Sequence, residues 1–174
     1  RGKILGNLNS KLKLKKKPTG IDIVDHKDKD KRIFFKKINA SKFFSINKEK
    51  FDLILIKQTI HFLKLEEIRK LISICKTKLN YKGKILIFTL DTSHNEIPSF
   101  LLMKKKLKKS LDRDKKIIRL ICKRYPKSKS IKFSFNVNIT RKIYIKMIKN
   151  RYISTLLDLS LSEILKGIDE IKLK

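Results

Sequence analysis

The sequence contains little of what builds the commonest functional sites. It has no Trp, two Cys, three Pro and five Gly in 174 residues, and aromatic residues make up 8% of the chain. The few aromatic residues do not alternate with the basic runs, which argues against a platform that stacks single-stranded bases. Cys75 and Cys122 lack closely spaced partner ligands, so a metal site is not indicated. Both cysteines fall in helical apolar patterns, and we expect core thiols in a reducing cytoplasm.

Long hydrophobic runs and the familiar catalytic motifs are also missing. No apolar stretch approaches the roughly 20 residues needed to cross a bilayer, and the Lys-rich N-terminus lacks the apolar segment of a signal peptide. The sequence has no His-x-x-x-His pair, no phosphate-binding loop and no Ser-His-Asp order with a supporting motif. These absences argue against a membrane span and against metal-dependent, nucleotide-hydrolysing and triad enzymes.

Acidic residues are scarce, because 16 Asp and Glu accompany 46 Lys and Arg and leave a formal net charge of +30. Such a charge is typical of a protein that binds nucleic acid or an anionic membrane surface. The alternative is compositional. Of the basic residues, 38 are Lys, spread along the chain with dense clusters at 13–17 and 104–109, whereas proteins that read bases favour Arg. Enrichment in Lys, Ile and Asn is also what a codon pool rich in A and T produces at exposed positions.

What the sequence does contain is a β-α-β pattern. Residues 51–56 are apolar except for Asp52 near their start, and Lys57-Gln58 follows them. This pattern is typical of a buried strand. Residues 65–79 repeat apolar positions on one helical face, and residues 84–89 read as a second strand. This order favours a parallel α/β sheet. In such sheets ligands bind at the carboxyl ends of the strands.

The rest of the chain supplies further elements of one predicted α/β domain. With 41% hydrophobic residues the chain can build a core. Before the β-α-β pattern we expect a helix over 5–12, a short strand over 20–25 ending in acid, a strand over 32–38 and a connector over 41–50. After it we expect a turn at 80–83, a polar loop at 91–95 and one long or two broken helices over 97–124. A strand with one solvent-exposed face over 131–137 and a helix from Thr140 to about Asn150 would follow. Ser160 and Glu163 form a capping box for a last helix ending near Lys172.

These elements, in this order, resemble the class I S-adenosylmethionine-dependent methyltransferases, close to the branch called type 11. The most specific segments are 20–23 (GIDI), 51–54 (FDLI) with 60–63 (IHFL) after it, and 84–87 (KILI). The resemblance covers residues 6–90 well and residues 91–174 only in arrangement. It implies a Rossmann-like, mostly parallel sheet flanked by helices, with a cofactor-binding half over 1–90 and acceptor-side elements over 91–174.

The resemblance also implies a set of site residues. Asp22, at the end of a strand, stands where the family's carboxylate accepts hydrogen bonds from the ribose hydroxyls. Asn39 stands where the family usually has an Asp that contacts the adenine amino group, and Ala40 leaves room for the base. The implied cofactor-binding residues are Gly6, Asp22, Ile23, Asn39, Ala40, Lys57 and Gln58, and the implied acceptor-side residues are His61, His94 and Asn95.

Several of these residues have simpler interpretations. Asp22 is also typical of an acid that caps a turn, and His61 is as typical of a structural His at the start of a helix. His94 and Asn95 fall in a loop, where polar residues commonly face solvent. We assign no catalytic base to the chain.

The departures from the family pattern are concentrated at the N-terminus. The family's first strand ends in Asp-x-Gly-x-Gly-x-Gly, whose glycines let the backbone approach the cofactor. Here Gly6 and Gly2 remain, and Ile4 stands at the middle glycine position. The first strand would precede Arg1, and the family's last strand would follow residue 174. We therefore expect a truncated fragment or decayed copy, whose sheet lacks its central strand, so that the neighbouring strands either pair across the gap or leave backbone groups unpaired.

The function implied by the resemblance is methyl transfer from S-adenosylmethionine, which needs positioning of the acceptor rather than an acid-base pair. The family's nucleic-acid branches often carry a Pro-containing tetrad after the fourth strand. Here that place reads Lys57-Gln58-Thr59-Ile60, so a small-molecule or lipid acceptor is favoured. The alternative is a nucleic-acid-binding domain, non-enzymatic or RNA-modifying, that uses the basic charge.

Overall fold

The computed structural model describes residues 2–25, 27–57, 59–90, 98–134 and 136–173. The chain forms two compact units, one of residues 1–56 and 63–87 and the other of residues 57–62 and 88–174. None of the helices in the described ranges is long and apolar enough to cross a membrane.

The first unit is a mixed α/β structure, as expected. Its helices and strands are α1 (Lys3–Leu12), β1 (Thr19–Asp22), β2 (Phe34–Lys37), α2 (Ala40–Ile46), β3 (Phe51–Lys57), α3 (Leu65–Thr77) and β4 (Leu79–Phe88), the last residues of β3 and β4 falling in the second unit. The helices expected over 5–12 and 65–79 are present with nearly the expected bounds. The segment expected to be a connector over 41–50 instead contains α2, because the side chain of Asn39 caps that helix.

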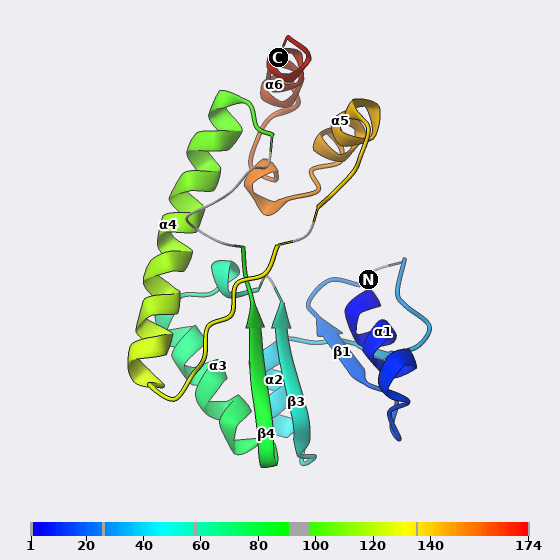
Figure 1. Ribbon diagram of the computed structural model, residues 1–174, viewed down its shortest axis with the longest axis vertical. Helices are drawn as coiled ribbons and strands as arrows, with labels where there is room; N and C mark the ends of the chain where they lie inside the picture. The colour runs from blue at the N-terminus through cyan, green and yellow to red at the C-terminus, as the bar shows by residue number, and fades with distance from the viewer. Residues whose placement is uncertain (1, 26, 58, 91–97, 135, 174) are drawn as a thin grey trace. The chain divides into compact units, whose positions relative to one another are not determined.

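The strands form two two-stranded sheets rather than one Rossmann-like sheet. Strands β1 and β2 pair in parallel, from Thr19 opposite Phe34 to Asp22 opposite Lys37. Strands β3 and β4 form the other sheet and run in the same direction (Figure 1). In the described part of the chain no strand joins the two sheets, so no continuous Rossmann-like sheet is formed, as expected for a sheet that lacks its central strand. Residues 3–12 do not supply that strand, because their apolar positions at 5, 8 and 12 repeat with helical spacing.

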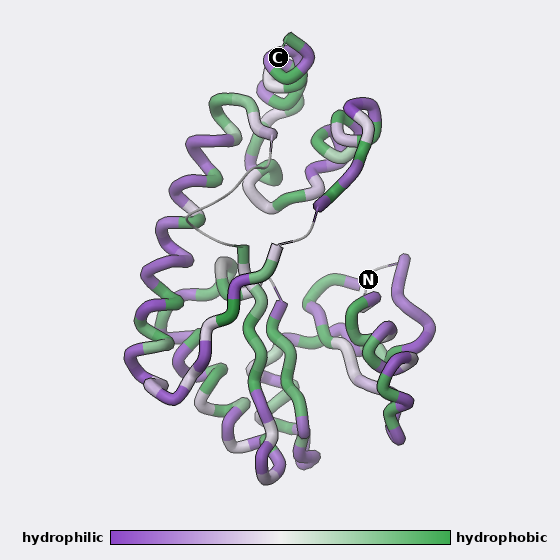
Figure 2. Tube along the Cα trace, in the orientation of Figure 1, coloured by the Kyte–Doolittle hydropathy of each residue, from purple (hydrophilic) through white to green (hydrophobic). Residues whose placement is uncertain are grey.

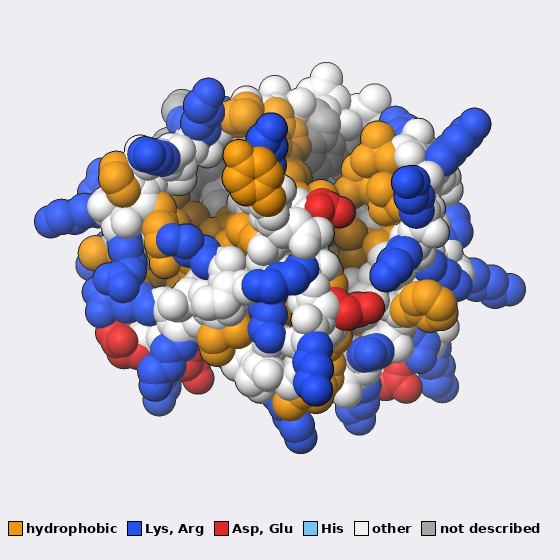
Figure 3. Space-filling view, turned by 90° about the horizontal axis from the view of Figure 1, so that it is seen from below, with side chains coloured by type: hydrophobic (Ala, Val, Ile, Leu, Met, Phe, Trp, Pro, Cys, Tyr) orange, Lys and Arg blue, Asp and Glu red, His pale blue; other side chains and the backbone are white. Residues whose placement is uncertain are grey.

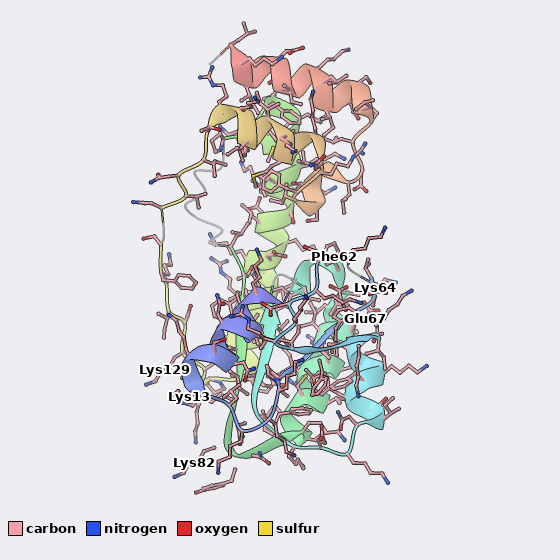
Figure 4. The ribbon with its side chains drawn as sticks, turned by 90° about the vertical axis from the view of Figure 1, so that its right-hand side faces the viewer. Lys13, Phe62, Lys64, Glu67, Lys82 and Lys129 are labelled. Atoms are coloured by element: carbon pink, nitrogen blue, oxygen red, sulfur yellow. The ribbon has the colours of Figure 1, made fainter. Side chains whose placement is uncertain are left out.

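Helices α2 and α3 pack together, and aromatic rings of α2 contact the start of β3. Three phenylalanine rings form an aromatic cluster, with centroids 5.1 Å apart for Phe43 and Phe44 and 5.9 Å apart for Phe44 and Phe51. Edge-on rings at these distances add to the area that they bury. Helix α3 begins at a capping interaction in which the backbone N–H of Lys64 donates to Glu67 Oε2 at 2.6 Å (Figure 4).

The turn expected at 80–83 is not a break between elements, because β4 runs through it from Leu79. The backbone is still unusual there, since Lys82 has a φ of 65°. A Cβ atom on Gly83 would lie 2.8 Å from the backbone oxygen of Phe51. The signal that predicted a turn therefore marks a close approach of β4 to the start of β3.

The second unit is helical, with η1 (Ile60–Phe62), α4 (Leu101–Arg124), α5 (Arg141–Lys149), η2 (Ser154–Leu156) and α6 (Leu161–Lys172). Its core lies between the first turns of α4, helix α5, η2 and α6, and consists of Phe100, Met103, Tyr144, Ile148, Leu156, Leu159, Ile164, Ile168 and Ile171. Hydrophobic and hydrophilic stretches alternate along α4 (Figure 2), as expected for a helix with one buried face.

The expected helices of this unit are confirmed with their caps. Thr140 Oγ1 accepts from the N–H of Ile143 at 3.3 Å, and Ser160 Oγ accepts from that of Glu163 at 3.3 Å. The expected strand over 131–137 is wrong, since its described residues adopt no strand and Ile131 is 81% exposed. Alternation alone does not make a strand without a partner. Cys75 is buried in α3 as expected, whereas Cys122 is exposed on α4.

Candidate functional site

Four of the predicted site residues meet at the carboxyl edge of the β1–β2 sheet. The parallel register ends with Asp22 opposite Lys37, and the N–H of Ile38 donates to the backbone oxygen of Asp22 at 2.8 Å. Asn39 and Ala40 follow the end of β2 after one intervening residue, and Ile23 comes directly after the end of β1. The structure therefore brings Asp22 and Asn39 to one edge of one sheet, which is the arrangement that the resemblance requires.

The side chain of Asp22 shapes the turn that leaves β1. Its Oδ1 atom accepts a hydrogen bond from the N–H of Val24 at 3.1 Å, an Asx-type turn. An ionised carboxylate offers about four acceptor positions, so this bond is compatible with a further donor. Ile23, next to it, is 66% exposed and is not part of the core.

Asn39 has a structural role that the sequence analysis missed. Its Oδ1 atom accepts from the N–H groups of Ser41 at 2.8 Å and Lys42 at 3.4 Å, and so caps α2. This is the same oxygen that an adenine amino group would need. An Asn at an N-cap is preferred for this local reason alone, and Asn followed by a short apolar segment was the signal. Ala40, the first residue of α2, is half-buried.

Gly6 lies inside α1 and not in a loop. It is buried, and a Cβ atom there would lie 2.5 Å from Asp30 Oδ2. Its observed role is to let the carboxylate of Asp30 approach the helix. Gly2 is the glycine that supports a turn, since it precedes α1 with a φ of 84°. Ile4 lies in the first turn of the helix and is 38% exposed.

Asp30 and Arg32 form a polar cluster on α1 that sequence reasoning did not identify. Arg32 Nη2 donates to Asp30 Oδ2 at 2.6 Å and to Asn7 Oδ1 at 2.8 Å, and Nη1 donates to Ser10 Oγ at 3.1 Å. Hydrogen bonds from the Arg32 side chain and backbone hold the pKa of Asp30 well below its usual range. This cluster fastens the loop before β2 to α1.

The remaining predicted residues are not part of this edge as the structure describes it. Lys57 ends β3, is exposed and belongs to the second unit, as does the backbone of His61 in η1. The His61 side chain, Gln58, His94 and Asn95 lie outside the described residues. Their predicted contacts with the methionine end of the cofactor and with the acceptor stay predictions.

Other polar groups in the described ranges do not add a second reactive site. No group of three or more His, Cys, Asp or Glu side chains there could hold a metal ion. Tyr144 donates to the backbone oxygen of Pro98 and lies 3.3 Å from the hydroxyl of Tyr152. Burial raises the pKa of both phenols, so they remain protonated at neutral pH and serve as core hydrogen-bonding groups.

No protein-family model matches the chain, and neither a curated protein nor a solved structure shows significant similarity to it.

Proposed function

We propose that the chain catalyses methyl transfer from S-adenosylmethionine. The carboxyl edge of the β1–β2 sheet would bind the nucleoside of this cofactor. The observation that carries the proposal is the parallel register that sets Asp22 beside Ile38 and hence next to Asn39. Two acceptor side chains at the ends of adjacent parallel strands suit a ribose and a base. We further propose that the two parallel sheets are the two sides of one Rossmann-like sheet.

The residues at this edge have distinct tasks. The Asp22 carboxylate would accept hydrogen bonds from ribose hydroxyls, and the small side chain of Ala40 would leave space for the flat base. Asn39 would meet the adenine amino group with an oxygen that it shares with the α2 N–H groups. Gly2 would allow the chain to turn closely before α1, where the family has its glycine-rich loop.

S-adenosylmethionine, when bound, supplies a methyl group on a sulfonium that leaves readily. The protein then has to hold a nucleophilic acceptor in line with that methyl group and keep water away, which requires no acid-base pair. We propose that the acceptor is a small molecule or a lipid, because the segment after β3 lacks the Pro-containing tetrad of the family's nucleic-acid branches.

The test is calorimetric titration with S-adenosylhomocysteine. Asp22→Ala should weaken binding by about 1–3 kcal/mol, the cost of losing a charge-assisted hydrogen-bonding partner. Asp52→Ala is the matched control, because Asp52 lies at the start of β3, where its Oδ1 accepts from Asn80 Nδ2 at 2.8 Å. The control should leave the affinity unchanged.

Two results would overturn the assignment. Equal affinities of the parent chain and Asp22→Ala would remove Asp22 from the site. Absence of binding by the folded parent chain at millimolar ligand would remove the methyl-transfer proposal itself.

A further inference from the structure

Helix α4 carries a disproportionate share of the positive charge. Its 24 residues contain eight Lys, three Arg and two Asp, so its net charge is +9 of the chain's +30, in about a seventh of the length. On the face of the molecule shown in Figure 3, Lys and Arg side chains also outnumber acidic ones, so a general enrichment exists. The question is whether α4 is more than a part of that enrichment.

The residues of α4 divide into a buried face and an exposed face. The buried side consists of Met103, Leu107, Leu111, Asp114 and Ile117. Asp114, 5% exposed, lies on this buried side, so Asp112 is the only acidic residue of α4 on the outer face. The exposed basic residues are Lys104, Lys105, Lys108, Lys109, Arg113, Lys116, Arg119, Lys123 and Arg124.

The length of this basic face indicates the size of its partner. From Lys104 to Arg124 the helix rises about 30 Å at 1.5 Å per residue. That is several times the Debye length of about 8 Å at physiological salt. A small anion would therefore neutralise only one or two of these side chains, whereas an extended polyanion would neutralise the whole row.

The chemistry of α4 narrows the kind of polyanion. An interfacial membrane helix inserts its apolar face into lipid, but the apolar face of α4 is already buried, with Met103 in the core of the second unit and Leu107 and Leu111 each 7% exposed. Single-strand binders stack bases on aromatic side chains, and α4 has no aromatic residue. Lys acts on phosphate as a point charge without reading bases.

We infer that the outer face of α4 is a binding surface for the phosphate backbone of duplex nucleic acid, without sequence preference. The inference does not rest on the proposed methyl transfer. It states that binding depends on the outer face of α4 and not on the basic charge of the whole chain.

The experiment compares two variants that remove four lysine charges each from the second unit. The α4 variant changes Lys105, Lys109, Lys116 and Lys123 to Gln, all on one helical face and exposed. The control variant changes Lys142, Lys146 and Lys149 of α5 and Lys166 of α6 to Gln, which are also exposed. Circular dichroism establishes that both variants fold, and fluorescence anisotropy with a 20-base-pair duplex measures affinity from about 50 to 200 mM salt.

The parent chain should bind the duplex at physiological salt, and the α4 variant should bind at least about tenfold more weakly. Each lost phosphate contact lowers the slope of log affinity against log salt by about 0.9, so the α4 variant should lose about three to four units of slope. The control variant should lose less than about threefold in affinity. Equal losses in the two variants would show that the charge acts as a whole and would overturn the inference.

Two further arms test the kind of partner. Tighter binding to a single strand of the same length than to the duplex would contradict the duplex assignment. Sedimentation with phosphatidylserine vesicles, without duplex binding at the same salt, would assign the surface to membranes instead. RNA and DNA duplexes tested in parallel distinguish the two sources of the same phosphate chemistry.

Discussion

At the scale of single residues, the carboxylate of Asp30 occupies the space that a side chain at position 6 would need. Gly6 is in the interior of α1, where an alanine would favour the helix by about 1 kcal/mol in isolation. The Asp30 carboxylate prevents that gain, because a Cβ on Gly6 would lie 2.5 to 2.8 Å from its three terminal atoms. Arg32 holds the carboxylate in place through hydrogen bonds at 2.6 and 2.9 Å.

We therefore predict that Gly6→Ala destabilises the protein by about 1–3 kcal/mol, the usual cost of overpacking. Urea denaturation would measure this change in the free energy of unfolding. In the Asp30→Ala background the same substitution should cost nothing or stabilise, since the colliding atoms are gone. An equal loss in both backgrounds would show that another neighbour of Gly6 causes the effect.

At the scale of elements, α6 begins at a complete capping box. The backbone N–H of Ser160 donates to Glu163 Oε2 at 2.7 Å, and the Ser160 hydroxyl donates to the same oxygen at 2.9 Å. These two bonds, of which the backbone bond has the larger effect, lower the pKa of Glu163 below its ordinary value of 4.5. Because the carboxylate is bonded only in the folded state, its contribution is present above the unfolded pKa and is lost as the pH falls through the folded pKa.

Ser160→Ala should cost about 0.5–2 kcal/mol in unfolding free energy at neutral pH. Ser130→Ala is the control, because Ser130 is exposed and lies in no helix or strand. Glu163→Gln should flatten the decline of stability below about pH 4.5, which urea titrations between roughly pH 3 and 7 would show. A decline as steep in Glu163→Gln as in the parent would rule out this carboxylate as a source of acid sensitivity.

At the scale of the whole molecule, the charge of +30 opposes folding. Like charges repel over a Debye length of about 10 Å at 0.1 M salt, and more salt shortens that range to about 3 Å at 1 M. The 16 acidic residues are too few to pair one-to-one with the 46 basic residues. Ion pairs such as Lys172 with Asp169 at 2.9 Å are local and exposed, and pairs of this kind add little.

Raising NaCl from about 0.02 to 0.5 M should therefore raise the thermal midpoint, by about 2–4 °C for each kcal/mol of repulsion removed. Differential scanning fluorimetry would measure the shift. Sucrose at the same osmolarity is the control for effects that do not involve charge. A midpoint that falls or stays constant with NaCl would contradict the role of self-repulsion.

Cysteine and strand predictions show where pattern reasoning stops. Cys75 follows the helical repeat of α3 and is buried, which raises the pKa of its thiol to about 12. Cys122 also lies in a helical apolar pattern but is exposed, because it is off the buried face of α4 that carries Leu107, Leu111 and Ile117. The alternation at 131–137 is as regular as that of any strand, yet Phe133 is 67% exposed and contacts the ring of Phe88 without strand pairing.

The sequence by itself determined the features that depend on residues three or four positions apart. The helices over 3–12, 65–77, 141–149 and 161–172 and the caps at Thr140 and Ser160 follow from such spacing. Only the tertiary structure decided that β1–β2 and β3–β4 form separate sheets, and that Gly6 makes room for Asp30. The physical reason is that helix hydrogen bonds and caps close within one turn, whereas strand pairing and close packing need atoms that are distant in the chain.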